Sequence, residues 1–199
     1  MLNMGVVGGG EVCAATLRQF DLAGLSTEAH VIVRGRIEAT EARFDEERGR
    51  IYSYTTVKVL ERLKGDSEAE IITVQQLGGS AEGLTMTVPG SAVLSTGEEV
   101  VLFLRTDDRY HYLVGMHQGR FGVRRPSPER DKPATEETAW VTRAPFTERS
   151  AHTPPCASPA ALGEGARELG EFLAQIRAYL AHGAESNDLN PPLRPRTEE

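Results

Sequence analysis

The chain has 199 residues and a formal net charge of -7, with 39% hydrophobic and 26% charged residues, which suits one globular domain with appendages. The negative charge disfavours nucleic acid and anionic lipid as partners, because both need a basic surface. No run of about 18 apolar residues occurs, so the sequence predicts no membrane-spanning helix.

Residues 1–15 are predicted to be a flexible arm or a truncated export signal. The apolar pair Val6–Val7 is followed by three glycines, so this stretch matches a signal peptide only in part. Val12-Cys13-Ala14-Ala15 has the small residues typical of the end of such a signal. We therefore expect a periplasmic or secreted protein, and the sequence leaves a cytoplasmic location open.

Cys13 and Cys156 are the two cysteines of the chain. In an exported protein they form a candidate disulfide, which would stabilise the fold by about 4 kcal/mol on the chain-entropy model. In the cytosol they would be two separate thiols. Two cysteines are too few ligands for a zinc site on their own, so we expect none.

Residues 16–124 are predicted to form a β-rich domain. A short helix over Asp21–Ala29 opens it, with Asp21 as a plausible N-cap. The first strand, residues 30–40, contains Gly35 at its centre, which indicates a bulge or sharp bend. The second strand, residues 50–63, is long enough that it must coil. Further strands are predicted at 70–77, 84–88, 100–105, 110–116 and 118–124.

The strand at 100–105 is apolar on both faces, so it is predicted to be the most buried one. Residues 41–49, between the first and second predicted strands, are predicted to be a charged turn. The long second strand together with the glycine in the first one favours a small closed antiparallel barrel of five to seven strands.

The C-terminal third has a different composition. Residues 125–158 are predicted to be an irregular linker packed on the barrel, with Trp140 and Phe146 as anchors. Residues 159–183 are predicted to form a long amphipathic helix, capped by Ser158, which docks either on this barrel or on a partner chain. Residues 184–199 are predicted to be a disordered tail.

The search for chemistry predicts no catalytic, cofactor-binding or metal-binding residues. Ser80 lies in a poor match to a nucleophile elbow, because Glu82 stands where the motif has glycine. His111 and His117 lack a third ligand. Glu98 and Glu99 are adjacent, so they are predicted to point to opposite faces of the strand and not to form a carboxylate pair. Arg34, Arg36 and Arg120 are predicted to lie on a solvated basic face.

Three short motifs resemble those of the netrin-like, or tissue-inhibitor-of-metalloproteinases-like, domain. They are Ala29-His30-Val31-Ile32-Val33 in the first strand, Leu63-Lys64-Gly65 after the second, and Gly97-Glu98-Glu99-Val100-Val101-Leu102 later. The resemblance covers about residues 13–124. It implies an OB-type five-stranded barrel, as in many bacterial exported proteins. In the true inhibitors of this family, the N-terminal cysteine binds the zinc ion of the protease.

We therefore expect a non-enzymatic extracytoplasmic module that binds a protein or another ligand, with no cofactor. The alternative is a metalloprotease inhibitor that acts through the arm around Cys13. A third reading is an enzyme whose site is assembled from scattered residues. The sequence leaves the partner and the oligomeric state open.

Overall fold

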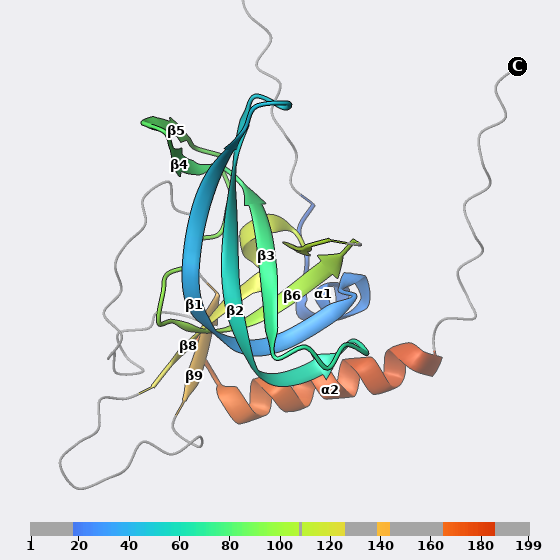
Figure 1. Ribbon diagram of the computed structural model, residues 1–199. Coiled ribbons are helices and arrows are strands. Elements are labelled where there is room, and N and C mark those ends of the chain that lie inside the picture. Colours follow the sequence, from blue (N-terminus) through green and yellow to red (C-terminus); the bar gives the residue numbers. More distant parts are fainter. Residues whose placement is uncertain (1–17, 108, 126–138, 144–164, 186–199) are drawn as a thin grey trace, which may run out of the picture.

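The computed structural model describes residues 18–107, 109–125, 139–143 and 165–185 (Figure 1). The expectation of a β-rich fold is confirmed. Two α-helices are present in the described residues: α1 spans Leu22–Glu28 and α2 spans Leu169–Glu185. The strands are β1 Val31–Asp45, β2 Arg50–Lys64, β3 Ile71–Leu77, β4 Gly79–Ala81, β5 Leu84–Met86, β6 Glu99–Thr106, β7 His111–Leu113, β8 Arg120–Arg124, β9 Trp140–Arg143 and β10 Arg167–Glu168.

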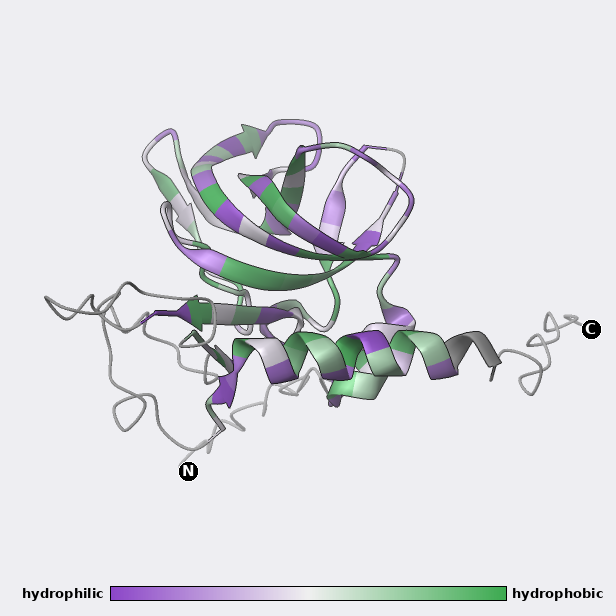
Figure 2. Cartoon of the chain, turned by 90° about the horizontal axis from the view of Figure 1, so that it is seen from below, coloured by the Kyte–Doolittle hydropathy of each residue, from purple (hydrophilic) through white to green (hydrophobic). Residues whose placement is uncertain are grey.

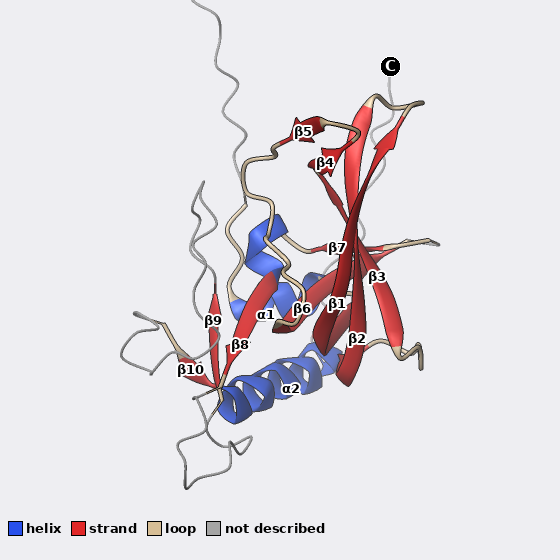
Figure 3. Cartoon of the chain, turned by 60° about the vertical axis from the view of Figure 1, so that its left-hand side comes forward, coloured by secondary structure: helices blue, strands red, loops and turns tan. Residues whose placement is uncertain are grey.

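Strands β1 and β2 form a long antiparallel ribbon that rises above the rest of the sheet (Figures 1 and 3). The pairing continues to Asp45↔Arg50, so β1 runs through most of the segment that the sequence predicts to be a charged turn. The predicted bulge at Gly35 is confirmed, because the register shifts between Arg34 and Gly35. A Cβ atom at position 35 would lie 2.6 Å from Cγ1 of Val57 and 2.8 Å from the carbonyl oxygen of Lys58. Glycine therefore lets the two strands approach each other closely.

The main sheet has eight strands in the order β1-β2-β3-β7-β6-β8-β9-β10, with an additional pairing of β1 with β6. It curls partway round into a ring, but it is not the closed antiparallel barrel that the sequence predicts. Strand β7 has three residues and meets β3 at one pair, Val74↔His111, and that pairing is parallel. Strands β8, β9 and β10 continue beyond β6 and lie away from the ring (Figure 3).

Strand β6 is the most buried strand, as its sequence predicts, with Val100 to Leu104 all 0% exposed. Its side chains alternate between two hydrophobic cores. Val100, Leu102 and Leu104 belong to the ring core, where they join residues of β1, β2 and β3. Val101 and Phe103 belong to the helix core, where they join residues of α1, β8, β9 and α2. Each core therefore contains one face of β6.

Helix α2 lies along one side of the curled sheet, and hydrophobic and hydrophilic residues alternate along both elements (Figure 2). Its residues Leu169, Phe172 and Ile176 are buried in the helix core. The sequence left open whether this helix packs on its own sheet or on a partner chain; in the structure it packs on its own sheet. The helix begins at Leu169, whereas the sequence places its start at residue 159; residues 159–164 lie outside the described residues. Helix α1 is capped by Asp21, whose Oδ1 accepts a hydrogen bond from the Gly24 amide at 2.7 Å.

The prediction that residues 125–158 are irregular throughout is wrong at β9. This strand pairs with β8 from Phe121↔Arg143 to Arg124↔Trp140, and it buries Val141 in the helix core. Trp140 is half-buried on this strand. Strand pairing with β8 thus gives order to four residues whose neighbours in the sequence are polar and rich in proline.

Several predictions fall on parts of the chain outside the described residues. These are the arm at 1–15, the tail at 184–199 apart from its first two residues, the anchor Phe146, and the candidate disulfide between Cys13 and Cys156. Neither described helix combines the length and the hydropathy that a helix needs to cross a bilayer.

Candidate functional site

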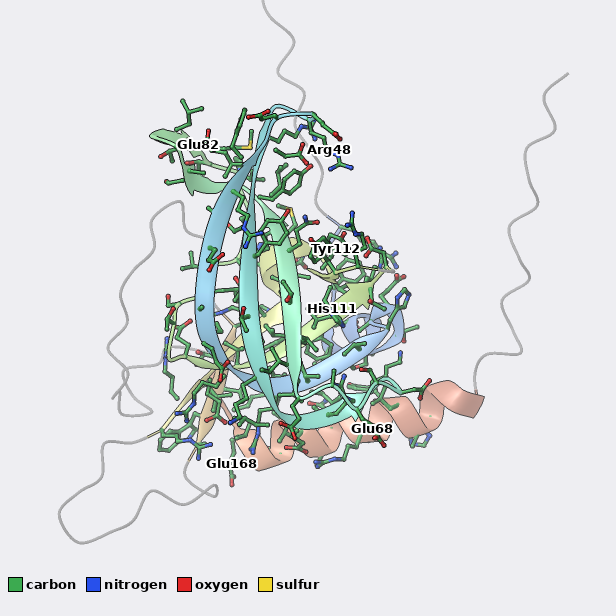
Figure 4. The ribbon with its side chains drawn as sticks, in the orientation of Figure 1. Arg48, Glu68, Glu82, His111, Tyr112 and Glu168 are labelled. Carbon is green, nitrogen blue, oxygen red and sulfur yellow. The ribbon has the colours of Figure 1, made fainter. Side chains whose placement is uncertain are left out.

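Three tyrosines that lie far apart in the sequence meet on the outside of the ring, and we call Tyr54, Tyr110 and Tyr112 the tyrosine cluster. Tyr54 is on β2, on the face opposite the buried Thr55 and Val57. The rings of Tyr54 and Tyr110 are tilted against each other with centroids 5.2 Å apart. All three side chains are half-buried, so each keeps part of its surface in contact with solvent. Figure 4 shows Tyr112 and His111 on the side where β7 approaches β3.

Hydrogen bonds fix the polar ends of the cluster. The Gln75 side-chain amide donates to the Tyr54 hydroxyl at 3.0 Å. The Tyr112 hydroxyl donates to Oδ2 of Asp107 at 2.6 Å. Oδ1 of the same carboxylate accepts hydrogen bonds from the backbone N–H groups of Arg109 and Tyr110, both at 2.8 Å. Because Asp107 holds the turn and one phenol together, the cluster is preorganised.

Near neutral pH, Tyr112 and Asp107 each have one protonation state. Burial and, after it, the hydrogen bond to Asp107 raise the pKa of Tyr112 to about 12. The same hydrogen bond is the main cause that lowers the pKa of Asp107, and the two backbone N–H groups lower it further. Tyr112 therefore remains a neutral donor and Asp107 a charged acceptor, which suits recognition rather than proton transfer.

A charged rim borders the tyrosine cluster. The guanidinium of Arg43 lies over the Tyr54 ring, 5.6 Å from its centroid. Arg43 also donates a hydrogen bond to Glu41 at 2.9 Å, and both of these side chains are exposed. An arrangement of aromatic faces, polar tips and exposed ion pairs is typical of surfaces that bind other molecules.

The two histidines singled out from the sequence occupy different places. His111 is on β7, and its Nδ1 lies 3.3 Å from the carbonyl oxygen of Thr73 on β3. Burial lowers the pKa of His111. His117 is in a short 3-10 turn, Met116–Gly119, with its Nδ1 3.2 Å from the carbonyl oxygen of Gly90. Within the described ranges no three His, Cys, Asp or Glu side chains are grouped to hold a metal ion.

Glu98 and Glu99 bind separate sets of arginines. Glu98 accepts hydrogen bonds from Arg120 at 2.8 Å and from Arg124 at 3.3 Å. Glu99 is 8% exposed and accepts a forked pair from Arg125, with Nη2–Oε1 at 2.9 Å and Nε–Oε2 at 3.2 Å. Both carboxylates are neutralised by guanidinium groups, which do not lose their protons in proteins. These ion pairs tie the start of β6 to β8 and to the residue that follows it.

The Glu99 pair belongs to a longer row of charges that crosses the molecule. Nε of Arg34 lies 3.8 Å from Glu99 and 3.5 Å from Glu61, and Glu61 also binds Arg177 of α2. The prediction of a solvated basic face is therefore wrong for Arg34 and Arg120, whose side chains are 12% and 8% exposed. Arg36 alone of that predicted set is exposed. The carboxylates that pair with these arginines lie far from them in the sequence, so the sequence alone did not predict the ion pairs.

Ser80 lies on β4 and is exposed. Its Oγ is 2.8 Å from Oγ1 of Thr85 on the paired strand β5. The segment is a small hairpin and not the strand-to-helix turn that a nucleophile elbow needs.

The tyrosine cluster was not predicted, although the sequence contains a sign of it. Tyrosines alternate at 52 and 54 and again at 110 and 112, so each pair lies on one face of its strand. The missing information was the sheet order, which brings β7 next to β3 and thus near β2. Comparison with models of known protein families gives no match to this chain, and comparison with curated protein sequences gives none either.

Proposed function

We propose that this protein is a non-enzymatic module that acts outside the cytoplasm and binds a protein partner through the tyrosine cluster. The observation that carries the proposal is that Tyr54, Tyr110 and Tyr112 lie together on one face. Hydrogen bonds hold the hydroxyl groups of Tyr54 and Tyr112 in place. Tyrosine provides a large rigid contact area with a polar end, and it is enriched among the residues that dominate binding energy.

The surroundings of the cluster favour a protein over other ligands. The exposed Arg43–Glu41 pair and the charged Asp107 offer partners of both signs at the rim. The net charge of -7 works against nucleic acid. The location outside the cytoplasm is supported by the resemblance of residues 13–124 to the netrin-like domain. The inhibitor alternative depends on Cys13, which lies outside the described residues, so it gains no observation of its own.

The test begins with site-specific cross-linking in the full chain. Tyr112 is replaced by a photo-reactive phenylalanine derivative, and the protein is exposed to an extract of the compartment in which fractionation finds it. Glu68, in the turn between β2 and β3, carries the same group in a control protein (Figure 4). We expect one protein to be cross-linked from position 112 and not from position 68, and mass spectrometry identifies it.

The affinity of that purified partner is then measured for the wild type and two variants. Tyr54→Ala is expected to weaken binding at least tenfold, because it removes a central aromatic contact. Tyr179→Ala, which removes a half-buried tyrosine of α2, is the matched control and is expected to bind as the wild type does. Equal affinities for all three proteins, or cross-links that join only copies of this chain, would overturn the proposal. Recovery in the cytoplasmic fraction alone would overturn its location.

A further inference from the structure

A pocket of about 270 Å³ lies between the start of α1, strands β8, β9 and β10, and the start of α2. It is near the small end of the range of roughly 300–1,000 Å³ for ligand pockets. Its apolar walls come from Leu22, Phe121, Val141 and Phe172. Its polar groups are Arg143, Arg167 and Asp21. The pocket thus has hydrophobic walls and a net charge of one positive unit from these three side chains.

Strand pairing explains why the two guanidinium groups come together. Arg143 is opposite Phe121 on β8, and Arg167 is opposite Val141 on β9. Since directly paired residues point to the same face of a sheet, as do residues two apart on one strand, Arg143 and Arg167 share a face with Phe121 and Val141. Their positions are diagonal to each other, about 7–8 Å apart in a regular sheet.

Neutral groups hold both arginines in place. The Arg143 guanidinium lies over the Phe121 ring, 5.0 Å from its centroid, and donates a hydrogen bond to the Phe20 carbonyl oxygen at 3.2 Å. Arg167 donates to the side-chain oxygen of Gln175 at 2.7 Å. Within the part of the chain that the structure describes, neither arginine forms an ion pair with a carboxylate. Among the other thirteen arginines that the structure describes, nine do form such pairs.

The electrostatics of the site agree with this arrangement. Burial is the main cause that lowers the pKa of Arg143, and the positive charge of Arg167 lowers it further. Asp21 acts in the opposite direction, and its Oδ1 also accepts the hydrogen bond that caps α1. A neighbouring open hollow of about 540 Å³ shares Asp21 and Arg143 and adds Arg18. An anion placed between the guanidinium groups would relieve their repulsion.

We infer that this pocket binds a small amphiphilic carboxylate, of the kind represented by a medium-chain fatty acid. The carboxylate would accept hydrogen bonds from the Arg143 and Arg167 guanidinium groups, whose planar forks match its geometry. The aliphatic chain would lie against the phenylalanine and valine side chains, where its burial contributes the hydrophobic part of the affinity. This inference is independent of the tyrosine cluster, which is built from β2, β7 and the turn before β7.

The first test compares four compounds on the full-length wild-type protein by titration calorimetry. Octanoate has both the charge and the chain, octanol has only the chain, acetate has only the charge, and octylammonium has the opposite charge. We expect measurable binding of octanoate and at least tenfold weaker binding of the other three. The single tryptophan, Trp140, lies on β9 on the face opposite Val141, so its fluorescence checks that the strand stays folded during the titration.

The second test measures octanoate binding to two charge variants. Arg167→Gln removes an exposed side chain that donates a hydrogen bond to Gln175, so the fold is expected to remain intact and the affinity to fall at least tenfold. Arg48→Gln, at the far tip of the β1–β2 ribbon, is the matched control and should leave the affinity unchanged (Figure 4). Equal binding of octanoate and octanol, equal binding of octanoate and acetate, or equal losses in the two variants would overturn the inference.

Discussion

Glu99 shows how a single residue can hold distant parts of this chain together. Its carboxylate is at the start of β6, and it binds Arg125, which follows β8, and lies beside Arg34 of β1. A buried charge is costly unless it is paired, so the stability of this region depends on the partners being present. Arg34 in turn links to Glu61 and, through it, to Arg177 of α2. The residue therefore joins the sheet and the helix electrostatically.

Replacement of Glu99 by glutamine is expected to lower the free energy of unfolding by about 1–3 kcal/mol, because Arg125 loses its charged partner and Arg34 keeps only Glu61. The measurement is urea denaturation at neutral pH, followed by circular dichroism. Glu41→Gln is the control, since its pair with Arg43 is exposed with side chains 66% and 71% accessible and such pairs contribute little. Similar losses in the two variants would show that the burial of Glu99 is irrelevant.

At the scale of elements, the ribbon of β1 and β2 depends on the bulge at Gly35. The close approach of the Lys58 carbonyl oxygen leaves no room for a side chain at that position. The register of the ribbon shifts there and again between Ile37 and Ala39, and such irregularities increase the local twist of a strand. Residues 32–36, which include Gly35, pair with β6 as well as with β2.

Gly35→Ala is expected to destabilise the protein by about 1–3 kcal/mol, because the added methyl group overpacks the β1–β2 contact. Gly170→Ala is the matched control. A Cβ atom at position 170 meets nothing within 4 Å, and the residue lies in α2, so alanine should stabilise the helix by up to about 1 kcal/mol. Thermal unfolding of both variants distinguishes the two signs; a stabilising change at Gly35 would contradict the packing argument.

The elements that could be predicted are those whose own residues determine them. The apolar run Val100–Leu104 identifies β6 as a buried strand, and Gly35 identifies the bulge. Strand β9 could not be predicted, since its four residues become a strand only by pairing with β8. The Glu99–Arg125 pair joins residues 26 apart, and the pocket that contains Arg143 and Arg167 is lined by five elements, α1, β8, β9, β10 and α2. Nothing in the local sequence encodes such distant neighbours.

For the whole molecule, the important feature is how the ring is completed. The β3–β7 contact is one parallel pair between Val74 and His111, whereas β1 and β2 pair along their whole length. The side chain of His111 adds a contact to the Thr73 carbonyl oxygen at the same place. Asp107 favours protonation of this histidine and Arg62 opposes it, but burial is the largest influence. The β3–β7 pairing is thus the shortest in the ring, and a titratable side chain lies at it.

The lowered pKa of His111 makes stability depend on pH. An unfolded chain binds this proton near the ordinary pKa of 6.5, and the native protein binds it only at lower pH. Since the unfolded state holds more protons in that interval, the free energy of unfolding falls as the pH drops below about 6.5. His111→Gln should show a smaller loss of stability between about pH 7.5 and about pH 5, measured by urea denaturation. An unchanged difference between the two pH values would show that His111 is not responsible.

The alternation of β6 between the two cores determines where this chain can be divided. A fragment that ends at Arg124 would keep the ring core complete but would lose Val141, Phe172 and Ile176 from the helix core. Val101 and Phe103 would then lose the part of their cover that β9 and α2 provide, at a cost of roughly 25 cal/mol for each Å² of apolar surface exposed. Strand β9 and helix α2 are therefore part of the minimal folding unit.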